Sequence, residues 1–223
     1  MNINKKQNMK LTNKIEITNE DNMELMARYP DNYFDLAIVD PPYGIGRSES
    51  MLNGSSYKGT NGWKKHLKKT WDNEIPSKKY FDELFRISQN QIIWGANYFV
   101  EYLKKGSMGW VFWDKGQNIK MSDGELAFTS FNKAMRRIVI NRCEIKKDGS
   151  IHSTQKPVKL YEFLLMNYAK EGDKILDTHL GSGSIAIACH NLGFELTACE
   201  LDEDYFDSAI KRIENHISQQ RLF

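Results

Sequence analysis

The chain has 223 residues, of which 40% are hydrophobic and 27% charged, and its formal net charge is +2. This composition is typical of one globular core with a small appendage, and no apolar run approaches the roughly 18 residues that a membrane span needs. Residues 1–10 are polar and lack the apolar stretch of a signal peptide, so we expect a cytoplasmic protein. Cys143, Cys189 and Cys199 are widely separated, which argues against a disulfide framework and against a zinc site.

The first predicted elements lead to a proline-rich turn. Residues 1–10 are expected to be a frayed tail, and residues 14–18 a short strand. Asp21 or Asn22 can cap a helix that runs to about residue 29. Residues 33–39 are apolar and favour β structure, so they predict a buried strand. That strand must end at Asp40-Pro41-Pro42-Tyr43, because proline cannot donate a hydrogen bond to a neighbouring strand.

This turn carries residues suited to one kind of ligand. In open α/β sheets, ligands bind beyond the carboxyl ends of the strands, which is where Asp40 would lie. A carboxylate, the Pro41 carbonyl and the Tyr43 ring suit a planar group with an exocyclic amine, through hydrogen bonds to the amine and stacking on the ring. The alternative is an ordinary turn in which Tyr43 caps the core.

A basic segment follows the turn. Residues 44–73 show no periodicity, are rich in glycine, serine, asparagine and lysine, and include Tyr57, Trp63 and Trp71. Aromatic rings among lysines favour contact with nucleic acid, although the tryptophans can equally belong to a satellite core, and charge runs are often solvated faces. The predicted DNA contacts there and in the later basic group are Arg47, Lys58, Lys64, Lys65, Lys68, Lys69, Arg136 and Arg137.

Strands and helices alternate through the rest of the chain, which predicts an α/β fold with one doubly wound, mostly parallel sheet in a single domain, residues 1–223. The expected helices are 77–88, 97–103, 157–169, 184–192 and 204–216, and the expected strands are 91–94, 109–113, 125–131, 136–140, 174–176 and 195–199.

A second motif lies between the predicted strand 174–176 and the helix from residue 184. Asp177 is followed by a glycine turn, Gly181-Ser182-Gly183, where backbone N–H groups can approach a ligand closely. Glu200, at the end of the next strand, can bind a ribose diol. The dinucleotide-binding pattern G-x-G-x-x-G is incomplete, because Ala186 stands at the position of its third glycine. A P-loop is excluded, because the motif has no Gly-Lys-Ser/Thr. The motif therefore predicts a nucleoside ligand.

Three motifs together resemble the amino-methylating DNA methyltransferases. They are Asp40-Pro41-Pro42-Tyr43, the run from His152 to Pro157, and the run from Leu176 to Ser184. Their order resembles the permuted beta group, and the blocks 94–99 and 113–117 are similar to small site-specific adenine methylases of phages and prophages. The resemblance extends over residues 15–215 and implies a Rossmann-like methyltransferase fold that uses S-adenosylmethionine.

The resemblance also implies roles at matching positions. Asp40 and Pro41 would accept hydrogen bonds from the target amine, with Pro42 shaping the turn, and Tyr43 would stack on a flipped base. Lys156 would pair with the carboxylate of the cofactor, and Glu200 with its ribose. The full set of implied cofactor residues is Asp21, Asn22, His152, Ser153, Thr154, Lys156, Asp177, Thr178, His179, Gly181, Ser182, Gly183, Glu200 and Leu201.

The chain departs from the family pattern in two ways. His179 replaces an aromatic residue and Ser184 a threonine, and residues 131–152 are too short for a recognition domain, which leaves residues 44–73 as the expected DNA reader. The resemblance implies N6-methylation of adenine in double-stranded DNA, without a metal. N4-methylation of cytosine, methylation of RNA or protein, and a non-catalytic DNA- or nucleotide-binding module are the alternatives. A homodimer and a cognate restriction endonuclease are compatible partners, and the recognition sequence is not encoded in any motif.

Overall fold

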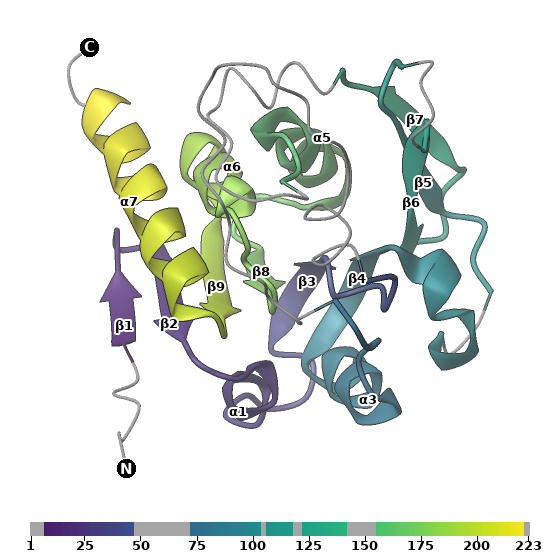
Figure 1. Cartoon of the computed structure of the whole chain (residues 1–223), viewed down its shortest axis with the longest axis horizontal. Coiled ribbons are helices and arrows are strands. Elements are labelled where there is room, and N and C mark those ends of the chain that lie inside the picture. The colour runs from purple at the N-terminus through teal and green to yellow at the C-terminus, as the bar shows by residue number, and fades with distance from the viewer. Residues whose placement is uncertain (1–6, 47–71, 104–105, 118–121, 142–154, 221–223) are drawn as a thin grey trace, which may run out of the picture.

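The computed structural model describes residues 7–46, 72–103, 106–117, 122–141 and 155–220. Within these ranges, nine strands form one sheet in the order β1-β2-β9-β8-β3-β4-β6-β5-β7 (Figure 1). The strands are β1 (Gln7–Lys10), β2 (Ile15–Asn19), β3 (Phe34–Val39), β4 (Ser88–Trp94), β5 (Trp110–Asp114), β6 (Gly124–Thr129), β7 (Arg136–Val139), β8 (Lys174–Asp177) and β9 (Glu195–Glu200).

The middle of the sheet is parallel. β2, β9, β8, β3 and β4 run in one direction, whereas β1 and β6 are antiparallel to their neighbours. β5 and β7 are parallel to each other and antiparallel to β6. The predicted α/β fold with a mostly parallel sheet is therefore confirmed, and the carboxyl ends of the five parallel strands lie at one edge.

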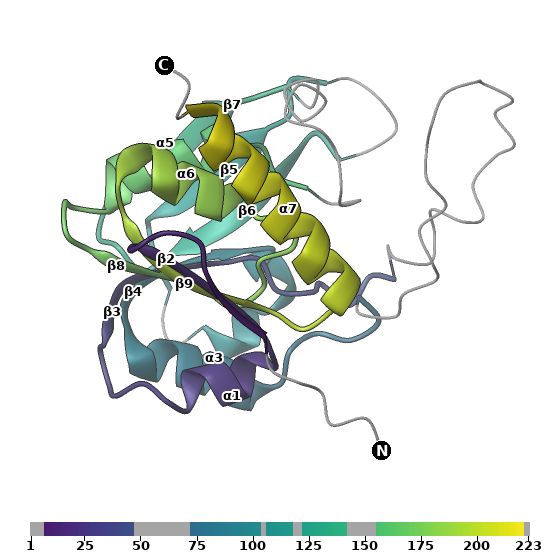
Figure 2. The same cartoon turned by 90° about the vertical axis from the view of Figure 1, so that its left-hand side faces the viewer.

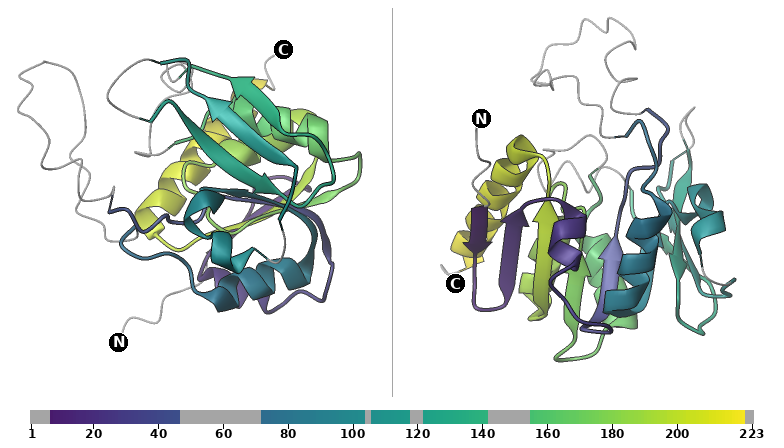
Figure 3. Two further views of the ribbon diagram at one scale, coloured as in Figure 1. Left: turned by 90° about the vertical axis from the view of Figure 1, so that its right-hand side faces the viewer. Right: turned by 90° about the horizontal axis from the view of Figure 1, so that it is seen from below.

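Helices cover both faces of the sheet (Figures 2 and 3). Successive side chains of a strand point to opposite faces, so Leu36 and Ile38 of β3 pack with α5, α6 and α7, while Ala37 and Val39 pack with α1 and α3. No helix in the described ranges is both long and apolar enough to span a bilayer. The helices are α1 (Asn22–Met26), α3 (Lys78–Ile87), α5 (Val158–Tyr168), α6 (Ser184–Leu192) and α7 (Glu203–Gln220), with short 3₁₀ helices η1 (Ala96–Tyr98) and η2 (Val100–Tyr102).

Two predictions for local structure are wrong. Residues 7–10 form β1 rather than part of a tail, because their backbone pairs with β2 in the register Met9↔Ile17. A hydrogen-bonded ladder of this kind leaves little trace in the side-chain pattern. The expected helix at 97–103 is replaced by η1 and η2. The predicted cap of α1 is confirmed, since Asp21 Oδ1 accepts a hydrogen bond from the Met23 N–H at 2.8 Å.

The central position of β3 predicts the effect of a truncation. Ile38 is fully buried and lies opposite Ile92 of β4. Ile38→Ala should lower the free energy of unfolding by about 2–5 kcal/mol, because it removes buried methyl groups and leaves a cavity. Urea unfolding measures this loss. The control Val139→Ala, at a side chain that is 56% exposed, should change stability by less than about 0.5 kcal/mol; equal losses would contradict the assignment of β3 to the core.

Candidate active site

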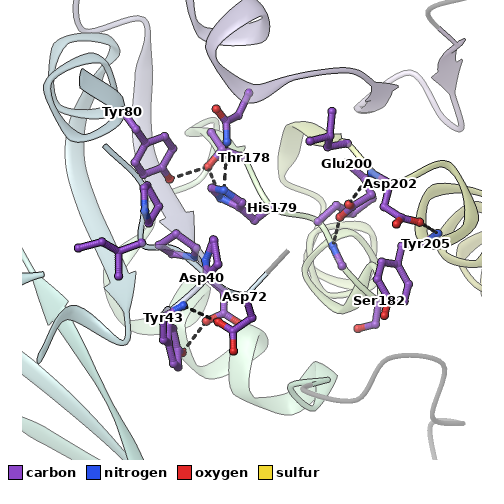
Figure 4. Close-up of a pocket in the computed structure, with 18 of the residues that line it drawn as sticks. Asp40, Tyr43, Asp72, Tyr80, Thr178, His179, Ser182, Glu200, Asp202 and Tyr205 are labelled. Carbon is purple, nitrogen blue, oxygen red and sulfur yellow. Dashed lines mark hydrogen bonds between the residues drawn. The ribbon is translucent and has the colours of Figure 1, made fainter. Parts of the chain in front are cut away.

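The proline turn and the glycine turn open into the same cavity. β3 ends at Val39, directly before Asp40, whereas β8 ends at Asp177 and β9 at Glu200. These three parallel strands are neighbours in the sheet. The cavity has a volume of about 600 Å³ and is lined by residues 40–43 on one side and by residues 178–182 and 200–202 on the other. Figure 4 shows Asp40 and Tyr43 at one end, and Glu200 and Asp202 at the other.

Hydrogen bonds fix the conformation of the proline turn. The Tyr43 hydroxyl donates to Asp40 Oδ1 at 2.7 Å, and the Tyr43 backbone N–H donates to Asp72 Oδ1 at 2.8 Å (Figure 4). The Asp72 carbonyl oxygen also accepts from the Gly46 N–H at 3.0 Å. Asp72 therefore joins the two ends of the predicted basic segment at the side of the cavity, while residues 47–71 lie outside the described ranges.

The ring of Tyr43 packs closely against the end of β4. A Cβ atom at Gly95 would lie 2.1 Å from Tyr43 Cε1, and the Gly95 φ is +65°. Glycine is therefore required here both for space and for backbone conformation. Tyr98, which is 45% exposed, stacks on Tyr43 with ring centroids 5.2 Å apart and planes inclined by 16°. The block 94–99 thus places a second aromatic ring beside the turn.

A chain of buried charges lies behind Asp40. Lys156 Nζ forms an ion pair with Asp40 Oδ2 and lies 3.1 Å from Glu125 Oε2. Lys115 Nζ lies 2.7 Å from the other carboxylate oxygen, Glu125 Oε1. The Lys156 ammonium also donates to the Tyr43 hydroxyl at 3.3 Å. The ammonium predicted to pair with a cofactor carboxylate is therefore held by the proline turn in this structure.

Burial and neighbouring charges set the pKa values of this chain. Burial raises the pKa of Asp40; the Lys156 ammonium opposes that shift and the Glu125 carboxylate adds to it. Burial also disfavours the charged form of Glu125, but Lys156 and Lys115 outweigh it and lower the Glu125 pKa to about 2. Burial would lower the pKa of Lys156, yet the Asp40 and Glu125 carboxylates raise it. Glu125 and Lys156 are consequently charged at neutral pH, and Asp40 is an unusually basic carboxylate.

The glycine turn is held by the carboxylate at the end of β9. Glu200 Oε2 accepts from the Gly181 N–H at 2.9 Å, and Glu200 Oε1 accepts from the Asp202 N–H at 3.0 Å (Figure 4). Each carboxylate oxygen can accept a further hydrogen bond from a ligand. Apart from its chain neighbours, a Cβ atom at Gly181 would have one neighbour within 4 Å among the described residues, the His179 carbonyl oxygen at 3.9 Å, so there is space beside this backbone.

Polar side chains connect α3, β8 and α1 across the cavity wall. The Tyr80 hydroxyl lies 2.7 Å from Thr178 Oγ1, which lies 2.9 Å from His179 Nδ1. His179 Nε2 is 3.0 Å from Asn22 Nδ2. Burial lowers the pKa of His179 to about 3, so the imidazole is neutral at physiological pH. The departure from the family pattern at His179 therefore supplies a hydrogen-bonding ring, and Tyr80 is a lining residue that sequence motifs did not indicate.

The remaining predicted residues occupy different positions. Ser182 and Leu201 line the cavity, whereas Asp21, Asp177 and Gly183 do not. Asp21 caps α1, and Asp177 accepts the His179 N–H at 2.9 Å. The predicted residues outside the described ranges are His152, Ser153, Thr154, Arg47, Lys58, Lys64, Lys65, Lys68 and Lys69.

The two predicted DNA contacts on β7 are exposed. Arg136 and Arg137 lie at the far edge of the sheet from β1. Arg137 Nη2 pairs with Asp114 Oδ2 at 2.6 Å, with 65% of the arginine side chain exposed. Their predicted contact with DNA stays a prediction.

Comparison with known proteins shows which proteins this chain is similar to. The DNA methylase family matches residues 132–211. Type II methyltransferase M.HpaI of Haemophilus parainfluenzae is 22% identical over an alignment that covers 88% of this chain and 73% of that protein. Type II methyltransferase M2.DpnII of Streptococcus pneumoniae is 35% identical over 71 residues, which cover 32% of this chain and 26% of that protein.

Solved structures share the fold. A crystal structure of the M1.HpyAVI–SAM complex has a TM-score of 0.57 at 18% identity, covering 88% of this chain and 98% of that one. The cytosine-N4-specific PvuII DNA methyltransferase has a TM-score of 0.57 at 11% identity, covering 91% and 92%. The fold is thus of the S-adenosylmethionine-dependent methyltransferase type. Together with the sequence matches, it supports a DNA methyltransferase.

The buried position of Asp177 predicts a pH-dependent stability. Burial raises its pKa to about 8 in the folded protein, so between pH 4 and 8 the folded state binds more protons than the unfolded state. Stability therefore falls as pH rises through this range. Asp177→Asn should become more stable relative to the wild type by up to about 1.4 kcal/mol per pH unit, measured by urea unfolding at several pH values. If the free energy of unfolding depended on pH in the same way for Asp177→Asn and the wild type, this prediction would be contradicted. Glu171→Gln, at an exposed side chain, is the control, and its curve should run parallel to that of the wild type.

Proposed function

We propose that the protein is an S-adenosylmethionine-dependent DNA methyltransferase that methylates an exocyclic amine of a flipped base. The observation that carries this proposal is the single cavity that joins the Asp40–Tyr43 turn to the Gly181 turn and Glu200. One end presents acceptors suited to an amino group, and the other presents a backbone turn and a carboxylate suited to a nucleoside. A nucleotide-binding module would not need the first end.

The described residues fit S-adenosylmethionine. A cavity of about 600 Å³ is within the usual range for a ligand of this size. Among the described residues, seven carboxylates and one lysine line it, which suits a ligand with a sulfonium and an ammonium group. Glu200 would hold the ribose, and Asn22 would lie at the adenine. The cofactor, when bound, supplies an electrophilic methyl group. The lining carboxylates are Glu20, Asp40, Asp72, Glu74, Glu125, Glu200 and Asp202.

Asp40 would activate the target amine. The lone pair of such an amine is conjugated into the base, so the nitrogen is a weak nucleophile. Hydrogen bonds from the amine to Asp40 and to the Pro41 carbonyl favour a tetrahedral nitrogen and stabilise its developing positive charge. The raised pKa of Asp40 suits a carboxylate that accepts the amine proton late, as the nitrogen gains its methyl group. Tyr43 and Tyr98 would form the aromatic surface beside the base.

We infer that adenine N6 is the target. An aspartate directly before Pro-Pro-Tyr, as in this chain, is more typical of the adenine methyltransferases than of the cytosine ones. Cytosine N4 is the second candidate, because the cytosine-N4-specific PvuII enzyme shares the fold and both bases present the same amino group to an acceptor. The target atom is inaccessible inside a duplex, so either base must be extruded at a cost of roughly a few kcal/mol. Sequencing of methylated DNA from an expressing host identifies both the base and the recognition site.

Replacement of Asp40 should separate chemistry from cofactor binding. Asp40→Asn removes the proton acceptor and should reduce methyl transfer by at least about 100-fold. Binding of S-adenosylmethionine should change little, because Asp40 lies at the opposite end of the cavity from Glu200 (Figure 4). Tritiated methyl transfer to unmethylated DNA and calorimetry measure the two effects. Equal loss of both would mean that the fold, rather than the chemistry, depends on Asp40.

Replacement of Glu200 should have the opposite signature. Glu200→Ala removes a charged acceptor and should weaken S-adenosylmethionine binding by about 1–3 kcal/mol. Glu203→Ala, three residues later on the exposed first turn of α7, is the matched control and should bind normally. An unchanged dissociation constant for Glu200→Ala, measured by calorimetry, would rule out the ribose role.

A further inference from the structure

No sequence motif assigns a role to Glu125 or to Lys115, although Lys115 lies within the block 113–117. The two residues nevertheless complete the charge chain behind Asp40. The charges alternate in space as Lys115, Glu125, Lys156 and Asp40. Lys115 follows the end of β5, and Glu125 lies in β6 opposite Trp113. Because β6 is antiparallel to β4, its first residues return to the edge of the sheet where the parallel strands end.

The charge chain of Lys115, Glu125, Lys156 and Asp40 is buried, and its four formal charges sum to zero. The side chains of Lys115 and Lys156 are 6% and 2% exposed, and those of Glu125 and Asp40 are 19% and 20% exposed. Lys156 Nζ lies 5.2 Å from the ring centroid of Trp94, and Lys115 Nζ lies 5.2 Å from that of Trp113. Little solvent therefore reaches these ammonium groups, and a buried charge without a partner is strongly destabilising. Each member depends on its neighbours for neutralisation.

We propose that Glu125 and Lys115 are positioning residues that act through Lys156 to set the orientation and basicity of Asp40. This inference rests on the proposed methyl transfer. Glu125 takes one hydrogen of the Lys156 ammonium, so Lys156 is shared between two carboxylates rather than held by Asp40 alone. Lys156 and, after it, Lys115 hold Glu125 in the ionised form.

The orientation of Asp40 follows from its two partners. Lys156 contacts Oδ2 and the Tyr43 hydroxyl contacts Oδ1, so the carboxylate plane is fixed from two sides. The negative charge of Glu125 also raises the pKa of Asp40. Without that charge, the charge chain itself would carry a net positive charge next to an amine that becomes positive during the reaction. A neutral charge chain is therefore better suited to the chemistry than one that lacks Glu125.

Three variants test this charge balance. Glu125→Gln gives the charge chain a formal charge of +1, Lys115→Gln gives it −1, and the double variant restores zero. Each is compared with the wild type by single-turnover transfer of a tritiated methyl group to unmethylated plasmid DNA between pH 5 and 9. Asp82→Asn is the control, because it removes an exposed ion pair with Lys78 in α3.

We expect Glu125→Gln to slow transfer by about 10- to 100-fold, the range for a misplaced reacting group. The acidic limb of its pH–rate profile should move to lower pH by about one unit, because Asp40 loses a neighbouring negative charge. Lys115→Gln should move the limb in the opposite direction and by less, since Lys115 is the most distant member. The double variant should be faster than Glu125→Gln and have a nearly native pH profile. Asp82→Asn should match the wild type throughout.

Several outcomes would overturn the inference. An unchanged rate and pH–rate profile in Glu125→Gln, or a double variant slower than Glu125→Gln, would show that the charge chain has at most a structural role. Urea unfolding without DNA or cofactor gives an independent measure, in which the double variant should lose less stability than the sum of the single losses; simple additivity would show that the charges are not coupled. A wild-type protein inactive on all DNA would instead overturn the proposed function, and this inference with it.

Discussion

The site depends on one buried ammonium group that two carboxylates share. Lys156 is almost completely buried, and Asp40 and Glu125 together neutralise it. In a poorly solvated environment neither carboxylate can be moved without leaving a charge uncompensated. The position of Asp40 is therefore tied to Glu125, although the two residues belong to different parts of the sheet. Lys115 extends the same constraint to β5.

The mixed topology of the sheet makes this arrangement possible. The parallel strands β3, β8 and β9 bring the proline turn, the glycine turn and Glu200 to one edge. The antiparallel strand β6 adds a carboxylate to the same edge by its beginning rather than by its end. The parallel part thus supplies the surfaces for the proposed ligands, and the antiparallel part controls the electrostatics of the proposed proton acceptor.

The two ends of the cavity differ in how their polar groups are satisfied. At the Asp40 end, charged side chains neutralise each other, and Gly95 leaves room for the Tyr43 ring beside them. At the Glu200 end, a carboxylate accepts two backbone N–H groups and retains lone pairs. The first end is suited to changing the protonation state of a bound group, and the second to holding a polar ligand without chemical change. A methyl transfer between a nucleoside cofactor and a base requires both.

The sequence by itself determined the α/β class, most strands and helices, the cap of α1 and the two turns at the cavity, because apolar periodicity, prolines and glycines act over a few residues. The tertiary structure decided which distant charges meet. Lys156 lies within the motif from His152 to Pro157, whose resemblance predicts pairing with a cofactor carboxylate, but in the fold it contacts Asp40, 116 residues earlier. Lys115 lies in the block 113–117 and Glu125 in a predicted strand, but neither position indicated its role in the charge chain. That role arises from an antiparallel strand pairing and from burial, which are properties of the folded sheet rather than of any short segment.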